Sequence, residues 1–129
     1  MAKVRTFISF AAEDKAFRDL FIGQSKNEDF PVELSDWSVQ ELFDEKWKTQ
    51  CRTRIRKTEL VLMLVGKTTW KADGACWEVS CAKEEGVPVF GVYIDKDNKG
   101  IIPTQLVGKS VIEWTWDGIA SKVRSLVKK

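Results

Sequence analysis

The stretch Val61-Leu62-Met63-Leu64-Val65-Gly66-Lys67-Thr68-Thr69 decides the fold of this 129-residue chain. A continuous apolar run between charged neighbours predicts a strand that is buried on both faces. Ligands of open α/β sheets bind beyond the carboxyl ends of such strands. The next helix, predicted from Ala75 to Gly86, places Glu78 in its first turn. The end of this strand and Glu78 are therefore the first places to look for function.

The composition is that of a soluble globular protein, with 43% hydrophobic and 31% charged residues. We expect a single domain over residues 1–129 with a sizeable core. The net charge of +2, with both signs interspersed, does not favour nucleic acid or membrane as a partner. One basic run could contact phosphate or could be a solvated helix face, and it consists of Lys48, Arg52, Arg54, Arg56 and Lys57.

Three cysteines and no histidine limit the possible chemistry. A sparse, odd set of cysteines without a CxxC pair indicates a reducing compartment and argues against zinc. The lack of histidine excludes Ser-His-Asp and Cys-His nucleophiles, so acid/base chemistry falls to carboxylates, lysine, tyrosine or cysteine. The N-terminus has no signal-peptide pattern and no segment is long enough to span a membrane. We therefore expect a cytoplasmic protein.

Hydrophobic periodicity predicts strands that alternate with helices. The predicted strands are Val4–Phe10, Val32–Val39, Leu60–Val65, Pro88–Ile94 and Ser110–Trp114. Four helices are predicted. The first begins at Ala11, the second and third span Lys46–Lys57 and Ala75–Gly86, and the last begins at Asp117. This alternation implies right-handed crossovers and a mostly parallel five-stranded sheet between helices. The leading interpretation is a flavodoxin-like three-layer sandwich with strand order 2-1-3-4-5.

Core and cap positions follow from the same pattern. Asp73 and Asp117 are predicted N-caps, and Gly86 the C-terminal residue of its helix. Residues 23–31 are predicted to be a loop, and Ile101-Ile102-Pro103 to pack a later loop onto the body. Two predicted core stripes are Ala16, Phe17, Leu20 and Phe21 in the first helix, and Trp47, Cys51 and Ile55 in the second.

Four phosphate- or nucleotide-binding patterns are absent. Gly66-Lys67-Thr68 resembles the end of a P-loop, but the required earlier glycine is replaced by Val61 inside the strand. No GxGxxG follows a strand. Glu13-Asp14 could imitate the acidic pair of a phosphate-accepting receiver domain, but the third strand lacks its terminal aspartate. A flavodoxin would need a hydroxyl- and glycine-rich loop where this chain has Ala11-Ala12-Glu13.

Glu78 has two explanations on sequence grounds. An acidic residue in the first turn of a helix is favoured by the helix dipole. Alternatively, its carboxyl group lies at the edge of the sheet where the carboxyl ends of the strands meet. Burial beside Trp77 would raise its pKa there and suit it to proton transfer or to stabilising a cation.

Two further groups lie where strands end. Asp36-Trp37-Ser38 could stack on and hydrogen-bond a nucleoside, or could pack an edge strand and satisfy its turn. Ser9-Phe10, at the end of the first strand, could contact a ligand or pack the end of the core.

Four segments together resemble a known family. They are FISFAAED from Phe7, GQSKNEDFPVELSDWSV from Gly23, WKTQCRTRIRKTELVLMLVGKTT from Trp47 and GACWEVSCAKEEGVPVFGV from Gly74. Over about three quarters of the chain they are similar to the TIR-like domain family that includes the Thoeris anti-phage defence TIR proteins. The resemblance implies a flavodoxin-like TIR fold and, for active members, cleavage of NAD+ at the nicotinamide–ribose bond.

The resemblance also implies roles for residues. The catalytic glutamate of the family falls on Glu78, and the pocket walls fall on Ser9, Phe10, Asp36, Trp37 and Ser38, with Lys67 and Trp77 as further substrate-binding candidates. No cofactor or metal is implied, because NAD+ is the substrate. The product would be ADP-ribose or a cyclic ADP-ribose-type signal. The implied partners are a second copy of the chain and an effector protein that responds to the product. A non-catalytic interaction or nucleotide-binding module is the alternative.

Overall fold

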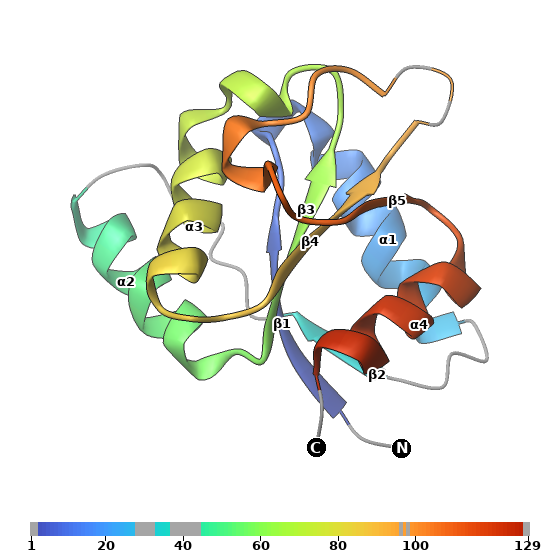
Figure 1. Ribbon diagram of the computed structural model, residues 1–129, viewed down its shortest axis with the longest axis horizontal. Helices are drawn as coiled ribbons and strands as arrows, with labels where there is room; N and C mark the ends of the chain where they lie inside the picture. Colours follow the sequence, from blue (N-terminus) through green and yellow to red (C-terminus); the bar gives the residue numbers. More distant parts are fainter. Residues whose placement is uncertain (1–2, 28–32, 37–44, 96, 98, 128–129) are drawn as a thin grey trace.

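A computed structural model of the chain describes residues 3–27, 33–36, 45–95, 97 and 99–127. A parallel β-sheet forms its middle layer, with α2 and α3 on one face and α1 and α4 on the other (Figure 1). The predicted α/β class with a parallel sheet between helices is confirmed.

In the part of the chain that the structure describes, the sheet contains five strands in the order β2-β1-β3-β4-β5. Each neighbouring pair is parallel. The strands are β1 (Lys3–Ser9), β2 (Glu33–Asp36), β3 (Leu60–Val65), β4 (Val89–Tyr93) and β5 (Val111–Glu113). Because all strands run the same way, their carboxyl ends meet at one edge of the sheet, and Ser9, Asp36 and Val65 end neighbouring strands there.

Among the described residues, four α-helices and three 3-10 helices accompany the strands. The α-helices are α1 (Lys15–Asn27), α2 (Glu45–Lys57), α3 (Asp73–Glu84) and α4 (Trp116–Leu126). The 3-10 helices are η1 (Ala12–Asp14), η2 (Thr69–Lys71) and η3 (Thr104–Leu106).

Strand β3 is buried over its whole length, as its apolar run predicts. Successive side chains of a strand point to opposite faces, so the strand serves two cores. Leu60, Leu62 and Leu64 join the cluster under α1 and α4. Val61, Met63 and Val65 join the cluster under α2 and α3. An element that feeds both cores cannot tolerate a polar residue on either side, which explains the unbroken run LVLMLV.

Helix α1 differs from its prediction in length and in orientation. It continues to Asn27, so the predicted loop is wrong for residues 23–27, and its remainder, residues 28–31, lies outside the described residues. Of the predicted stripe only Phe21 is buried, whereas Ala16, Phe17 and Leu20 are exposed. The inward face continues from Asp14 of η1 through Arg18, Phe21 and Ser25 of α1, at helical spacing. Polar residues at three of these four positions conceal the face from a hydrophobicity pattern.

Two predictions in the last third of the chain also need correction. Ile101 and Ile102 are exposed, and Pro103 with Leu106 of η3 anchors that loop instead. The N-cap of α4 is Thr115, whose Oγ1 accepts a hydrogen bond from the backbone N–H of Gly118, so Asp117 lies inside the first turn. The inward face of α4 carries the buried residues Ile119 and Val123.

Candidate functional site

Helix α3 begins two residues earlier than predicted, which changes the position of Glu78. Its N-cap is Ala72, without a side-chain cap, so the predicted capping role of Asp73 was wrong. The helix ends at Glu84, two residues before the predicted Gly86. Gly86 stops the chain from continuing as a helix, because its φ is 73° and its N–H bonds to the carbonyl of Lys83. Glu78 therefore lies in the second turn. The helix-dipole explanation loses its basis, because that effect fades beyond the first turn.

The Glu78 side chain is held between three elements. It is only 7% exposed, although it carries a carboxyl group. The Ser9 hydroxyl, at the end of β1, lies 2.8 Å from Oε1 of Glu78. The Cys51 thiol, on α2, lies 3.7 Å from Oε2 and donates a hydrogen bond to it. Each carboxyl oxygen of Glu78 therefore has one hydrogen-bond partner, which is Ser9 from the sheet for Oε1 and Cys51 from the neighbouring helix for Oε2.

Ser9 reaches this position because of strand geometry. It lies two residues after Phe7 in β1, so both side chains point to the face covered by α2 and α3. Ser9 is completely buried, and its hydroxyl also donates toward the backbone carbonyl of Ala75, 3.0 Å away. A strand-end serine is therefore joined to α3 at two points, one turn apart.

Burial governs the electrostatics of the cluster. It raises the pKa of Glu78 to about 8, against smaller lowering effects of the hydrogen bonds from Ser9 and Cys51. Burial, followed by the nearby Glu78 carboxylate, raises the pKa of the Cys51 thiol far above its ordinary value. At neutral pH the thiol is therefore a fixed donor, and the carboxyl group of Glu78 is the titrating member of the cluster.

Other predicted site residues that the structure describes follow or end different strands. Phe10 packs against the core cluster of the α1/α4 face, with the Arg18 guanidinium 5.9 Å from its ring centre. Asp36 ends β2 and is the register partner of Thr6 in β1. Trp37 and Ser38 lie outside the described residues. Lys67 is exposed, in the connection from β3 to η2.

Trp77 directly precedes Glu78 on α3. Its ring is half-buried and tilted against that of Trp47 on α2, with 5.3 Å between the ring centres. The Arg52 guanidinium lies 5.7 Å from the Trp77 ring centre. The two tryptophans thus pack α2 against α3, and Trp47 lies one turn from Cys51 on α2.

The acidic pair after β1 also lies at the carboxyl edge. Glu13 accepts a hydrogen bond from the Thr68 hydroxyl, and this bond lowers its pKa. Asp14 is buried, and burial followed by the charge of Glu13 raises its pKa. Across the described residues, no group of three His, Cys, Asp or Glu side chains is placed to hold a metal ion.

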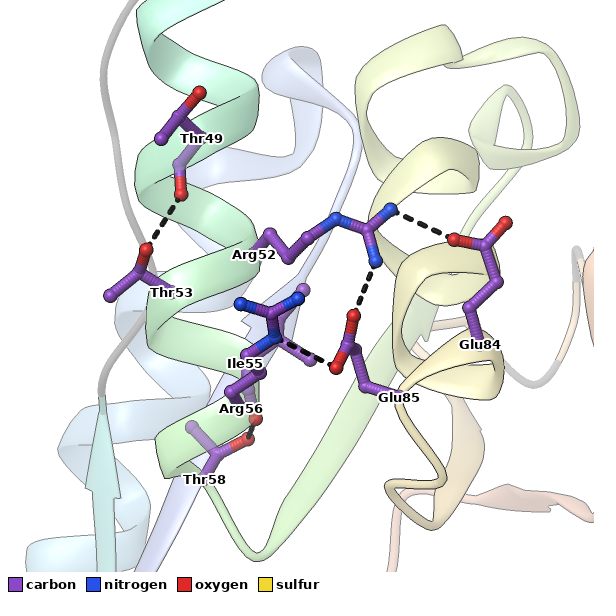
Figure 2. A network of polar contacts seen from close by, with 8 residues as sticks. All are labelled: Thr49, Arg52, Thr53, Ile55, Arg56, Thr58, Glu84 and Glu85. Atoms are coloured by element: carbon purple, nitrogen blue, oxygen red, sulfur yellow. Dashed lines mark hydrogen bonds and ion pairs between the residues drawn. The ribbon is translucent and has the colours of Figure 1, made fainter.

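The basic run on α2 is engaged with the end of α3. Arg52 contacts Glu84 and Glu85 at 2.8 and 2.5 Å, and Arg56 contacts Glu85 at 2.8 Å (Figure 2). Arg52 and Arg56 thus join α2 to the C-terminal end of α3. These two residues therefore fit neither sequence alternative, since they act as an interhelical clamp.

Removing this clamp is expected to loosen α2 from α3. Arg52→Ala lowers the melting temperature by a few degrees at low salt and by less in 1 M salt, because ions screen partly exposed pairs. Thermal unfolding of Arg52→Ala, Glu85→Gln and the double variant measures the coupling between the two residues. Strictly additive losses would contradict the clamp.

A surface groove lies away from this cluster. It has a volume of about 480 Å³ and sits where β4 and β5 end, against α1. Its lining residues are Phe17, Leu20, Gln24, Tyr93, Ile94, Glu113, Trp114 and Thr115. None of the predicted site residues is among them. The exposed apolar residues of α1 therefore line a groove on the opposite face of the sheet from Glu78.

Sequence reasoning missed Cys51 as a member of the site. The spacing of Trp47, Cys51 and Ile55 placed it correctly on the buried face of α2. No local signal indicates that its thiol meets a carboxyl group 27 positions later, because that contact depends on how α2 and α3 pack.

The sheet, its two helical layers and a buried carboxyl group at one edge define a flavodoxin-like α/β protein. A 3-dehydroquinate dehydratase-like protein from Bifidobacterium longum has a similar fold, with a TM-score of 0.50 and 15% sequence identity. The match covers 98% of this chain and 96% of that one, and at this identity it concerns the fold alone.

Residues 7–99 match the family model described as Thoeris protein ThsB, TIR-like domain, and the chain belongs to this family. The resemblance seen in the sequence is thereby confirmed. No curated protein matches the chain. Within the described ranges, no helix is both long enough and apolar enough to cross a membrane.

Proposed function

We propose that this chain acts as a single TIR-like domain that cleaves NAD+ at the nicotinamide–ribose bond, with Glu78 as the catalytic carboxyl group. The observation that carries the proposal is the buried Glu78 carboxyl, with Ser9 on one oxygen and Cys51 on the other. A buried carboxyl with a strongly raised pKa is uncommon in a purely structural role and typical of acid/base sites.

The chemistry requires one carboxyl group and neither metal nor histidine. When the C–N bond breaks, its electron pair passes to the nicotinamide ring, and the ribose develops oxocarbenium character. A nearby carboxylate stabilises that charge. Water then adds to the ribose carbon and gives up a proton, for which ionised Glu78 is the acceptor. An internal nucleophile in place of water would give a cyclic product.

The proposed setting is prokaryotic anti-phage defence in the cytoplasm, and the family membership supports the defence role. There the product would be ADP-ribose or a cyclic ADP-ribose-type signal, read by an effector protein. NAD+ is the substrate and no cofactor takes part. Assembly of several copies would complete the pocket around Glu78. The proposed substrate contacts are Ser9, Phe10, Asp36, Trp37, Ser38, Lys67 and Trp77.

One observation favours the alternative of a non-catalytic interaction or nucleotide-binding module. Both oxygens of Glu78 are already occupied within the fold, and the side chain is almost entirely buried. Concentrated protein, incubated with NAD+ and followed by chromatography of nicotinamide, separates the two functions. We expect release by the wild type and a background rate for Glu78→Ala. Equal rates, also with a molecular crowder or infected-cell lysate, would leave the binding module as the function.

The proposed base role gives the reaction a defined pH dependence. Because burial raises the pKa of Glu78 to about 8, the carboxylate is a minor species at neutral pH. The turnover number should therefore rise about tenfold per pH unit below that value and level off above it. Nicotinamide release between pH 6 and 9.5 measures this profile, and a rate that falls with rising pH would assign Glu78 the role of an acid.

A further inference from the structure

The hydrogen bonds around Glu78 contain a mismatch between hydrogens and acceptors. The Ser9 hydroxyl has one hydrogen, yet two acceptors lie within bonding distance, Oε1 of Glu78 at 2.8 Å and the carbonyl oxygen of Ala75 at 3.0 Å. A hydroxyl group can also accept hydrogen bonds through its lone pairs. Which partner Ser9 serves therefore depends on whether Glu78 itself carries a hydrogen.

Each protonation state of Glu78 satisfies the cluster in a different way. When Glu78 is neutral, its own hydrogen can be donated from Oε1 to Ser9, and Ser9 donates to Ala75. When Glu78 is ionised, Ser9 turns its hydrogen to Oε1. The heavy atoms stay where they are in both cases, and only the hydroxyl hydrogen rotates.

Cys51 determines which oxygen of Glu78 carries the proton. Its thiol remains protonated and a thiol is a poor acceptor, so it occupies Oε2 as a donor in both states. The strand β3 contributes only apolar residues to this cluster, and α3 adds the buried thiols Cys76 and Cys81. Oε1 is therefore the oxygen that takes and loses the proton.

We propose that Ser9 is a positioning residue for Glu78, and that rotation of its hydroxyl hydrogen lets the buried carboxyl group take up and release a proton at Oε1 without moving. In the reaction proposed above, on which the catalytic part of this inference rests, water loses a proton when it bonds to the ribose carbon. That proton passes to Oε1 of ionised Glu78, Ser9 turns from Oε1 to the Ala75 carbonyl, and the later loss of the proton to solvent restores the first arrangement.

The ionisation of Glu78 can be measured without any catalysis. Glutamate labelled with ¹³C at the side-chain carboxyl carbon gives a chemical shift that follows protonation, and Glu78→Gln identifies the signal. Ser9→Ala removes the donor that serves the charged form, so we expect the midpoint to rise by about one to two pH units. Ser9→Thr and Ser9→Val form a matched pair of nearly equal volume, of which only threonine keeps a hydroxyl.

We expect Ser9→Thr to keep a midpoint near that of the wild type and Ser9→Val to resemble Ser9→Ala. The pH profile of nicotinamide release should move with the midpoint, through the turnover number rather than the KM. An unchanged midpoint in Ser9→Ala would overturn the inference, and so would identical midpoints for threonine and valine. Should the larger side chains prevent folding, Ser9→Ala alone decides, because it needs no additional space.

Failure of this inference is distinct from failure of the proposed function. If Glu78→Gln still releases nicotinamide while Ser9→Ala shifts the midpoint, the hydroxyl exchange stands and the enzymatic role is wrong. If Glu78→Gln is inactive but Ser9→Ala titrates like the wild type, the enzymatic role stands and Ser9 does not control the proton.

Discussion

Glu78→Gln is expected to stabilise the fold by about 3 kcal/mol at pH 7 and to leave stability unchanged near pH 4. Glutamine has the shape of a neutral carboxyl group. Its amide can donate to Ser9, while its carbonyl accepts from the Cys51 thiol. The variant thus reproduces the neutral form of the cluster at every pH and cannot be forced to carry a charge.

The sign follows from the direction of the pKa shift. The pKa of Glu78 rises from 4.5 to about 8 on folding because of burial. The favourable contribution of Glu78 to the free energy of unfolding is therefore fully present below pH 4.5. It is lost as the pH rises toward 8, where Glu78 ionises in the folded protein as well. The Glu78→Gln variant keeps this contribution at higher pH, because glutamine does not ionise.

Urea unfolding of both proteins at half-unit steps from pH 4 to pH 9 measures the effect. Glu113→Gln is the matched control, because the Glu113 side chain is 56% exposed. The free energy of unfolding of this variant should differ from that of the wild type by an amount that varies little with pH. If the free energies of unfolding of Glu78→Gln and the wild type differed by a constant amount over this pH range, the carboxyl group would not lie in a strongly desolvated environment.

Leu62→Ala should reduce the free energy of unfolding by about 3 to 4 kcal/mol. Leu62 is 0% exposed in the middle of β3 and belongs to the cluster that joins the sheet to α1 and α4. Truncation removes buried apolar contacts and leaves a cavity between rigid elements. The strand packs on both faces, so its backbone has little freedom to close that space.

Leu20→Ala is the matched comparison for the same chemical change. Leu20 is 51% exposed on α1, and we expect its loss to alter stability by no more than about 0.5 kcal/mol. Denaturant unfolding of the two variants at one pH gives both values. Equal losses would restore the core role that the sequence pattern gave to Leu20.

The sheet was predictable because its residues carry strong and local signals. The run LVLMLV identified β3 and its double burial, and β-branched residues marked β1 and β4. Helix α2 was equally clear, since Trp47, Cys51 and Ile55 follow one another at helical spacing. In these elements, the positions that must be apolar for burial repeat with the period of the strand or the helix. The sequence pattern therefore identifies both the element and its buried face.

Helix α1 could not be placed correctly because its two apolar faces compete. Phe17 and Leu20 look like core residues, but the helix turns Phe21 inward with Arg18 and Ser25 beside it. Only packing against the sheet decides between these orientations. The helix starts at Asp73 and Trp116 were missed for a related reason, since Ala72 offers no capping side chain and Thr115 competes with Asp117.

The candidate site was predictable only in part. Glu78 followed from its place in the helix after the third strand and from the family resemblance, and Ser9 from the end of the first strand. The hydrogen bond between them spans 69 positions and depends on the exact depth of α3 against the sheet. Cys51 adds a third element, and no sequence pattern specifies how a thiol on α2 meets a carboxyl on α3.

The most direct measurement compares nicotinamide release from NAD+ by the wild type, Glu78→Gln and Glu84→Gln at one protein concentration and pH 8. Glu84 lies on the same helix, but its side chain is 63% exposed and pairs with Arg52 on the surface. Loss of a group that stabilises the transition state typically costs about 10²- to 10³-fold in turnover, so Glu78→Gln should fall by that factor while its fold gains stability. Glu84→Gln should stay within about twofold of the wild type. Nicotinamide release by a correctly folded Glu78→Gln at the wild-type rate would contradict the catalytic role of Glu78.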